Sequence, residues 1–133
     1  MKCFYHSADL DGHCSGGIVK YKYPETQLIG INYGEDFPWD TIEEGEKIFM
    51  VDFSLSADDM KKLADKANLV WIDHHNTALE EMKEAKLDFE GKQEEGKAGC
   101  ELTWEYLYPE ANIPHAVYLI GRWDVWDHKA NAA

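Results

Sequence analysis

Short apolar runs alternate with segments of helical character along the chain, and this alternation constrains the fold more than any other feature. The expected strands are KCFYH (2–6), QLIGINY (27–33), KIFMVDF (47–53), NLVWID (68–73) and a short edge strand, LDFEG (87–91). Strands that alternate with helices form a mostly parallel sheet, because each helix carries the chain back to the same end. The sequence therefore predicts an α/β fold with a mostly parallel sheet of about five strands and helices on both faces.

Five helices are expected between and after these strands. Their segments are 12–23, 57–67, 78–86, 98–108 and 115–123. Ser56 is the expected N-cap of the second helix, and Asn76 or Thr77 that of the third. Pro24 and Pro109 end the first and fourth helices, because the residue before a proline is disfavoured in helical conformation. No repeat or linker interrupts the pattern, so residues 1–133 are expected to form a single domain.

Charge and composition limit the partners and the compartment. The 133 residues include 26 acids and 13 Lys or Arg, which gives a net charge of −13 and predicts no binding to long duplex nucleic acid. The apolar runs are too short to span a bilayer and no signal-like leader opens the chain, so a cytoplasmic protein away from membranes is expected. Three cysteines (Cys3, Cys14 and Cys100) fit reduced thiols in that compartment.

Acidic and histidine side chains follow three of the expected strands at the point where each strand ends. Strand by strand, these residues are His6, Asp9 and Asp11; Asp52; and Asp73, His74 and His75, while Asp124, Asp127 and His128 form a further group near the end of the sequence. The carboxyl ends of parallel strands meet at one edge of a sheet, and α/β sheets bind their ligands there. We therefore expect these groups to share one site.

Carboxylate and imidazole ligands without thiolate suit Mn²⁺, Fe²⁺, Co²⁺ or Zn²⁺. The ligands are too numerous for one catalytic ion with an open position, but they suffice for two ions about 3.5–4 Å apart that share a carboxylate. Such a pair favours metal-assisted hydrolysis of a phosphoester. Each group alone also has a structural interpretation: Asp9 and Asp11 as helix caps, and Asp52 as a turn residue.

Four motifs, in this order along the chain, resemble those of the DHH phosphoesterase superfamily: HSADLDG (6–12), VDFS (51–54), DHH (73–75) and GRWDVW (121–126). The resemblance covers essentially the whole chain, and GKAGCELTWEYL (96–107) is similar to a helix of oligonucleotide-degrading, nanoRNase-like members. It implies a Rossmann-like N-terminal catalytic domain. Relatives normally continue into a smaller C-terminal substrate-binding domain, which we expect to be absent from residues 1–133, either because the sequence is a fragment of a longer protein or because it is a naturally short member.

The resemblance also implies two divalent ions, usually Mn²⁺, with Mg²⁺, Co²⁺ or Fe²⁺ as alternatives. The implied ligands of one ion are His6, Asp9 and Asp52. Those of the other are Asp11, Asp52, His74 and Asp124, so that Asp52 bridges. Asp127 is the alternative to Asp124 as the last ligand. His75 is expected to face the substrate phosphate and Asp73 to fix an imidazole, which makes these two the expected catalytic residues.

The predicted function is metal-dependent hydrolysis of phosphodiester or phosphomonoester bonds by a metal-activated water. Short oligonucleotides or small nucleotides are the expected substrates. The protein surface is acidic, and a small substrate carries few phosphates that need to be neutralised. Two alternatives remain open at this point. One is a catalytically incomplete, metal-stabilised module that binds a nucleotide or a partner protein, and the other is an inorganic pyrophosphatase. The sequence leaves the oligomeric state open.

Overall fold

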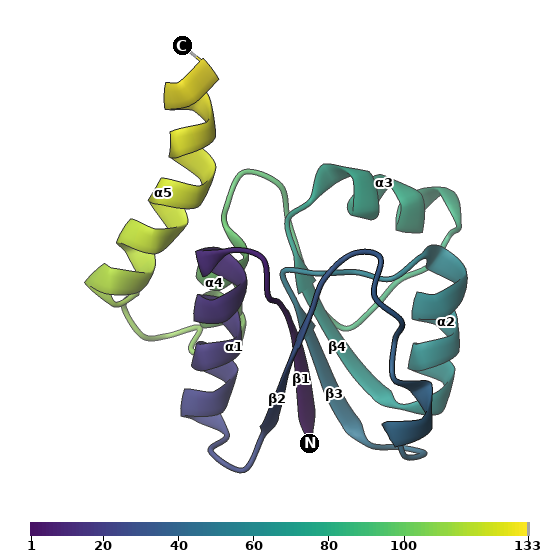
Figure 1. The fold of residues 1–133 in the computed structure, drawn as a ribbon. Helices are drawn as coiled ribbons and strands as arrows, with labels where there is room; N and C mark the ends of the chain where they lie inside the picture. The colour runs from purple at the N-terminus through teal and green to yellow at the C-terminus, as the bar shows by residue number, and fades with distance from the viewer. Residues whose placement is uncertain (133) are drawn as a thin grey trace.

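Five parallel strands form one sheet in a computed structural model of the protein, which describes the backbone of residues 1–132 and the side chains of residues 1–125. The order across the sheet is β2-β1-β3-β4-β5 (Figure 1). The strands are β1 (Lys2–His6), β2 (Gln27–Ile31), β3 (Lys47–Val51), β4 (Asn68–Asp73) and β5 (Gly91–Gln93). The predicted α/β class and the strand number are confirmed, and every strand pair within the described residues is parallel.

Helices cover both faces of the sheet, as the sequence predicts. One face carries α1 (Leu10–Lys22), α4 (Gly99–Leu107) and α5 (His115–Ala132), and the other carries α2 (Ala57–Lys66) and α3 (Asn76–Glu84) (Figure 1). A single 3₁₀ turn, Trp39–Thr41, lies in the connection to β3. The central strand, β3, alternates between the two cores: Ile48 and Met50 face α2 and α3, whereas Phe49 and Val51 face α1 and α4. This double burial explains the continuous apolar run of β3.

The order of the strands opens a crevice at the carboxyl edge of the sheet. From β1 the chain goes outward to the edge strand β2, and then returns past β1 to β3. The helices that follow β1 and β3 therefore lie on opposite faces (Figure 1). Ligands bind at such switch points in open α/β sheets. The loops after β1 and β3 carry the predicted site residues, so the topology directs them into this crevice.

Three details differ from the sequence-based expectations. The edge strand lies at Gly91–Gln93 instead of 87–91, since Leu87 and Phe89 pack into the core from a loop. Gly91 permits this pairing: a Cβ there would lie 1.9 Å from the carbonyl oxygen of Trp71. The predicted capping of α3 by Asn76 or Thr77 is also wrong, because its N-cap is His75, without a side-chain capping hydrogen bond. Finally, α1 begins two residues earlier than predicted and α5 extends to Ala132.

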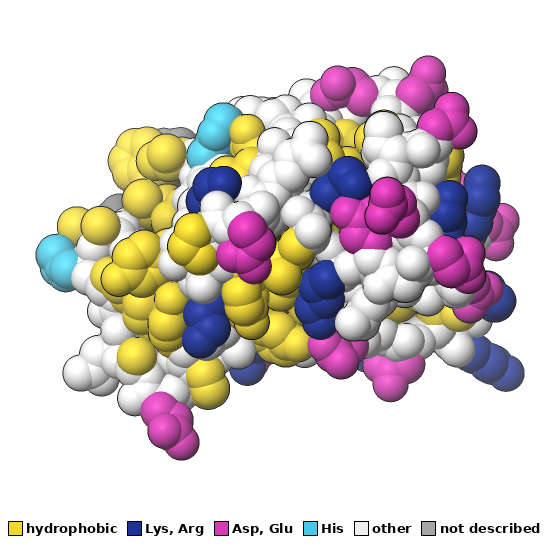
Figure 2. Space-filling model, turned by 90° about the horizontal axis from the view of Figure 1, so that it is seen from below, with side chains coloured by type: hydrophobic (Ala, Val, Ile, Leu, Met, Phe, Trp, Pro, Cys, Tyr) yellow, Lys and Arg dark blue, Asp and Glu magenta, His cyan; other side chains and the backbone are white. Residues whose placement is uncertain are grey.

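Acidic and basic side chains are interspersed on the face at the amino ends of the strands (Figure 2). Hydrophobic side chains gather at the left of this view. None of the helices described within residues 1–132 has the length and apolar character needed to cross a membrane.

Candidate metal centre

Side chains from four separate parts of the chain meet at the carboxyl edge of the sheet. Their potential ligand atoms form three groups, in each of which all atoms lie within 4.8 Å of one another. The groups are His6, Asp9 and Asp52; Asp11, His74 and Asp124; and Asp52, Asp73, His74 and His75. The structure therefore brings together all eight site residues named from the sequence. The side chains of Asp127, the alternative last ligand, and of His128 lie outside the described residues.

Asp52 lies between these groups. It follows β3 with a φ of 57°, in the left-handed region that Asp adopts more readily than most residues, and it is fully buried. Its Oδ1 lies 3.0 Å from Nε2 of His74, and its Oδ2 lies 3.8 Å from Nδ1 of His6. Burial, together with the nearby carboxylates of Asp11 and Asp9, raises the pKa of Asp52 to about 9, although the hydrogen bond to His74 opposes the shift. A cation bound next to this carboxylate would favour its ionised form at neutral pH.

Asp11 is buried at the N-terminus of α4. Its Oδ2 accepts the backbone N–H of Gly99 at 2.9 Å, and its Oδ1 accepts that of Cys100 at 2.8 Å. A helix N-terminus stabilises negative charge through its free N–H groups. Burial alone would raise the pKa of Asp11, but hydrogen bonds from His74 and Cys100 lower it to about 2. Nε2 of His74 lies 3.3 Å from Oδ2 of Asp11, so this ionised carboxylate belongs to the group that also contains His74 and Asp124.

Asp73 holds the turn that carries the two histidines. Its Oδ1 accepts the backbone N–H of His74 at 2.8 Å and that of His75 at 3.4 Å. The same oxygen lies 2.7 Å from Nδ1 of His75. This hydrogen bond raises the pKa of His75, while burial opposes the shift. It also orients the ring, so that Nε2 of His75 points away from Asp73 and lies 4.0 Å from Oδ1 of Asp52.

His6 and Asp9 complete the group nearest to β1. Nδ1 of His6 lies 3.4 Å from Oδ2 of Asp9, and its Nε2 lies 3.2 Å from Oδ1 of Asn32. Oδ1 of Asp9 accepts the backbone N–H of Gly12 at 2.8 Å and caps α1. Asp9 thus meets both interpretations offered by the sequence, since one oxygen caps a helix and the other faces the site. Gly12 allows this close approach, because a Cβ there would overlap the carbonyl oxygen of His6.

Helix α5 contributes Asp124, whose Oδ2 lies 3.8 Å from Nε2 of His74. The helix is joined to α4 by an ion pair in which Nη2 of Arg122 donates to Oε1 of the buried Glu101 at 2.6 Å. Gly121 gives Glu101 room, because a Cβ there would lie 2.5 Å from its side chain. The position of Asp124 therefore depends on a buried acid one helix away.

The residues present fit divalent cations. Among the described side chains, Nδ1 of His6, Oδ2 of Asp52 and Oδ2 of Asp73 are buried without a hydrogen-bond partner. Buried polar atoms are nearly always paired, and several adjacent acids repel one another unless a cation compensates them. Oxygen and imidazole donors without thiolate are typical ligands of Mn²⁺, Fe²⁺, Co²⁺ and Zn²⁺. The individual ligand roles stay predictions.

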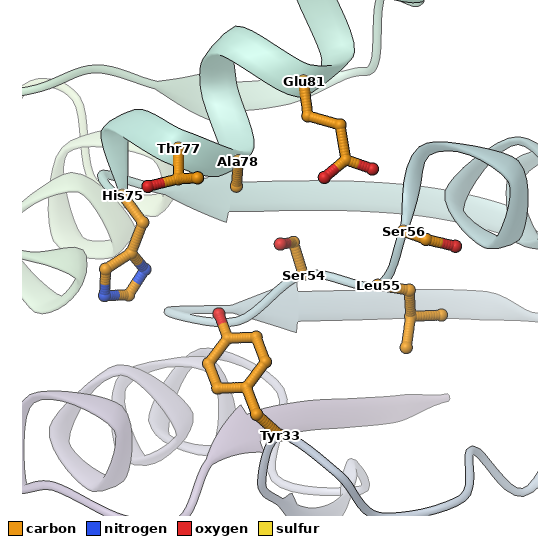
Figure 3. Close-up of a pocket in the computed structure, with 8 residues that line it drawn as sticks. All are labelled: Tyr33, Ser54, Leu55, Ser56, His75, Thr77, Ala78 and Glu81. Atoms are coloured by element: carbon orange, nitrogen blue, oxygen red, sulfur yellow. The ribbon is translucent and has the colours of Figure 1, made fainter.

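Two hollows open on either side of His75. One, of about 400 Å³, is lined by Tyr33, Ser54, Leu55, Ser56, His75, Thr77, Ala78 and Glu81 (Figure 3). The other, of about 620 Å³, is lined by Asp9, His74, His75, Glu95, Gly96, Asp124 and Val125. Both volumes lie in the range of small-molecule sites. A molecule whose phosphate contacts His75 has room for a substituent on each side.

Several contributors were not found from the sequence. The N–H groups of Gly99 and Cys100 hold Asp11, Asn32 contacts His6, and Glu101 pairs with Arg122. In the sequence, the small residues before Glu101 in GKAGCE could have indicated a helix N-terminus that packs closely against neighbouring groups. By contrast, His13 contacts the carbonyl oxygen of Ser7 outside the three ligand groups, and Trp104 stacks on Tyr108.

The acids and histidines at the carboxyl edge of this all-parallel α/β sheet form a candidate site for divalent metal ions. A family model described as the DHH family, N-terminal domain, matches residues 3–120. The chain belongs to the DHH family. Domains of this family use divalent metals, and the superfamily consists of metal-dependent phosphoesterases.

Two similar proteins are each described as uncharacterized. A protein of Acanthamoeba polyphaga mimivirus is 31% identical over 140 residues, which cover 94% of this chain and 33% of that protein. A crystal structure of a protein from Helicobacter pylori superimposes with a TM-score of 0.73 at 19% identity, over 95% of this chain and 44% of that one. The second likeness shows the fold alone. The chain thus spans about a third of the viral protein and less than half of the bacterial one.

Proposed function

We propose that this chain hydrolyses phosphoester bonds of small nucleotides or short oligonucleotides, with two divalent ions, most commonly Mn²⁺, held at the carboxyl edge of the sheet. The position of Asp52 is the observation that carries the proposal. Its two carboxylate oxygens face different histidines, Oδ1 toward His74 and Oδ2 toward His6. A carboxylate with one oxygen toward each of two ligand groups is suited to bridge two ions.

The ligand sets follow from the groups described above. His6 and Asp9 are the proposed ligands of the first ion, Asp11, His74 and Asp124 those of the second, and Asp52 is shared. When bound, the ions supply an activated water as nucleophile and neutralise charge on the phosphoryl group. Asp11 is held as a carboxylate by the N-terminus of α4, and is therefore ready to ligate without losing a proton.

His75 is the proposed contact to the substrate phosphate. Its ring is oriented by Asp73, whose Oδ1 lies 2.7 Å from Nδ1 and raises the pKa of the imidazole. A ring whose Nδ1–H donates to a buried carboxylate has its Nε2 available for a second partner, and protonation turns Nε2 into a donor to a phosphate oxygen. Asp73 acts through His75 and is a positioning residue.

Small substrates are favoured by the charges around the site. The acids that line the hollow beside Asp124 are Asp9, Glu95 and Asp124, and Glu81 lines the hollow on the other side. The described residues that line these two hollows include no Lys or Arg. A long polyanion would bring phosphates against these carboxylates, whereas a single phosphate at the ions would not. This supports mononucleotides and short oligonucleotides over long strands.

Hydrolysis of bis(p-nitrophenyl) phosphate tests the proposal. Turnover should require added Mn²⁺, stop on addition of EDTA and return when Mn²⁺ is restored in excess. Asp52→Asn should abolish it, whereas Asp65→Asn, an exposed acid on α2, should behave as the wild type. Ligand-dependent stabilisation without turnover would instead favour a binding module, and preference for pyrophosphate over every diester would favour a pyrophosphatase.

A further inference from the structure

The hollow between β3 and α3 has a lining unlike that of the metal edge. Hydroxyl groups come from Ser54, Ser56, Thr77 and Tyr33, a carboxylate comes from Glu81, and Leu55 and Ala78 add apolar surface. Figure 3 shows the carboxylate of Glu81 directed from α3 toward the segment that carries Ser54 and Ser56, with the hydroxyl of Tyr33 on the opposite side. His75 closes the end next to the metal centre.

This chemistry suits an uncharged group that bears hydroxyls. Among the side chains described in residues 1–125, no lysine or arginine lines the hollow, and the carboxylate of Glu81 would repel a second phosphate. Oε2 of Glu81 accepts the backbone N–H of Ala57 at 2.6 Å, which fixes the carboxylate at the N-terminus of α2. A carboxylate offers about four acceptor positions, so this one retains the capacity to accept hydrogen bonds from a ligand.

The position of the hollow indicates which part of a nucleotide would enter it. His75 lies on its border and is the proposed contact to the phosphate, so the group bonded directly to that phosphate is the first to reach the hollow. In a nucleotide this group is the sugar. A fixed acid that accepts from ribose hydroxyls is an established solution in dinucleotide-binding α/β folds. The ring of Tyr33 is stacked on Phe53 with centroids 4.4 Å apart, which holds its hydroxyl at the rim.

We propose that this hollow is a ribose subsite in which Glu81, with the hydroxyls of Ser54 and Thr77, accepts and donates hydrogen bonds to the 2′- and 3′-hydroxyls of a nucleotide. The inference rests on the proposed function for the placement of the phosphate. It favours ribonucleotides, because a 2′-deoxy sugar would lack one of the two hydroxyl donors to the Glu81 carboxylate and a 2′,3′-dideoxy sugar would lack both.

A titration followed by nuclear magnetic resonance tests the subsite independently of turnover. In the presence of the diamagnetic ion Mg²⁺, adenosine 5′-monophosphate should shift the amide signals of Ser54, Thr77 and Ala78. The 2′,3′-dideoxy analogue should bind about 10- to 100-fold more weakly, the range expected for hydrogen bonds to a charged group. Glu81→Gln should remove most of this difference, whereas Glu80→Gln, one residue away on α3 and outside the lining, should preserve it.

The outcomes separate the subsite from the reaction. Shifts confined to residues of the metal edge, or equal affinity for the ribo and dideoxy nucleotides, would overturn the subsite even if bis(p-nitrophenyl) phosphate is hydrolysed. A ribose preference that depends on Glu81 would support it even if no hydrolysis occurs, in which case the proposed reaction fails alone. If the affinity depended on the identity of the base but not on the sugar hydroxyls, the hollow would be assigned to the base, and the ribose assignment would be refuted.

Discussion

Nε2 of His74 lies 3.0 Å from Oδ1 of Asp52, so a half-buried imidazole and a buried acid share a hydrogen bond at the centre of the site. Burial raises the pKa of Asp52 to about 9. Burial opposes charge on His74, yet hydrogen bonds to Asp11 and Asp52 raise its pKa to about 10. Without metal, this pair therefore retains protons at neutral pH that metal ligation must displace.

Metal binding should consequently release protons at pH 7, and metal affinity should rise from pH 6 to pH 9. Isothermal titration calorimetry with Mn²⁺ in buffers of different ionisation enthalpy measures the number released. Both folded-state pKa values lie above the ordinary ones, so the folded protein binds more protons than the unfolded chain up to about pH 9–10. The melting temperature of EDTA-treated protein should thus fall as the pH rises from 6.5 toward 9. An affinity independent of pH would contradict the protonated pair.

Asp52→Asn should impair both ion sites together, because the amide is a weaker ligand at the shared position. His6→Ala should deplete mainly the first ion, and His74→Ala mainly the second. Elemental analysis of the three variants after growth with Mn²⁺ gives the number of ions per chain. As a mere turn residue, Asp52 would tolerate Asn at a cost of about 1 kcal/mol or less. Two ions bound normally by Asp52→Asn would refute the bridge.

Asp73→Asn should lower activity or metal affinity about 10–100-fold, the usual effect of removing the partner of a functional histidine. The reason is that the Asp73 carboxylate orients the ring of His75 and raises the pKa of its imidazole. Titration of the His75 ring protons should show a lower pKa in the variant, a change that a purely structural role would not produce. Asp88→Asn, in the exposed loop before β5, serves as the control.

Gly99→Ala should weaken metal binding and destabilise the fold. The added Cβ would lie 2.9 Å from both Cβ and Oδ1 of Asp52, on a helix whose first N–H groups hold Asp11, so the Asp52 carboxylate must move. Gly17→Ala on α1 is the matched control, since a Cβ there meets nothing within 4 Å. It should be neutral or stabilising by about 0.4–1 kcal/mol. Chemical denaturation with and without Mn²⁺ distinguishes the two; equal effects would show that Gly99 has no special role.

Arg122→Met should lower stability by about 1.5–3 kcal/mol, because it leaves the buried carboxylate of Glu101 without its charged donor. Occupancy of the ion held by Asp124 should fall as well, since the ion pair fixes α5 against α4. Lys61→Met breaks an ion pair in which both partners are exposed and should cost no more than about 1 kcal/mol. If the two variants have equal melting temperatures and metal content, the ion pair does not position α5.

The sheet and the assembly of its acids were predictable, because strand period and parallel topology determine which residues end a strand. His6, Asp52 and His74 are far apart in sequence. Their proximity could nevertheless be predicted from the rule that parallel strands end at one edge of the sheet. The partners of Asp11 were not predictable in this way: the N–H groups of Gly99 and Cys100 leave no trace in the pattern of side chains. The start of β5 was not predicted correctly. It is determined by the close contact between Gly91 and the backbone of Trp71, which only glycine permits.

The ribosome makes Asp11 long before it makes the groups that hold this carboxylate. The donors at Gly99 and Cys100 follow 88 and 89 residues later, and Asp124 follows later still. Until α4 has been made, the carboxylate of Asp11 lacks these two backbone donors. The ligand set that includes both Asp11 and Asp124 can therefore assemble only after α4 and α5 have been made.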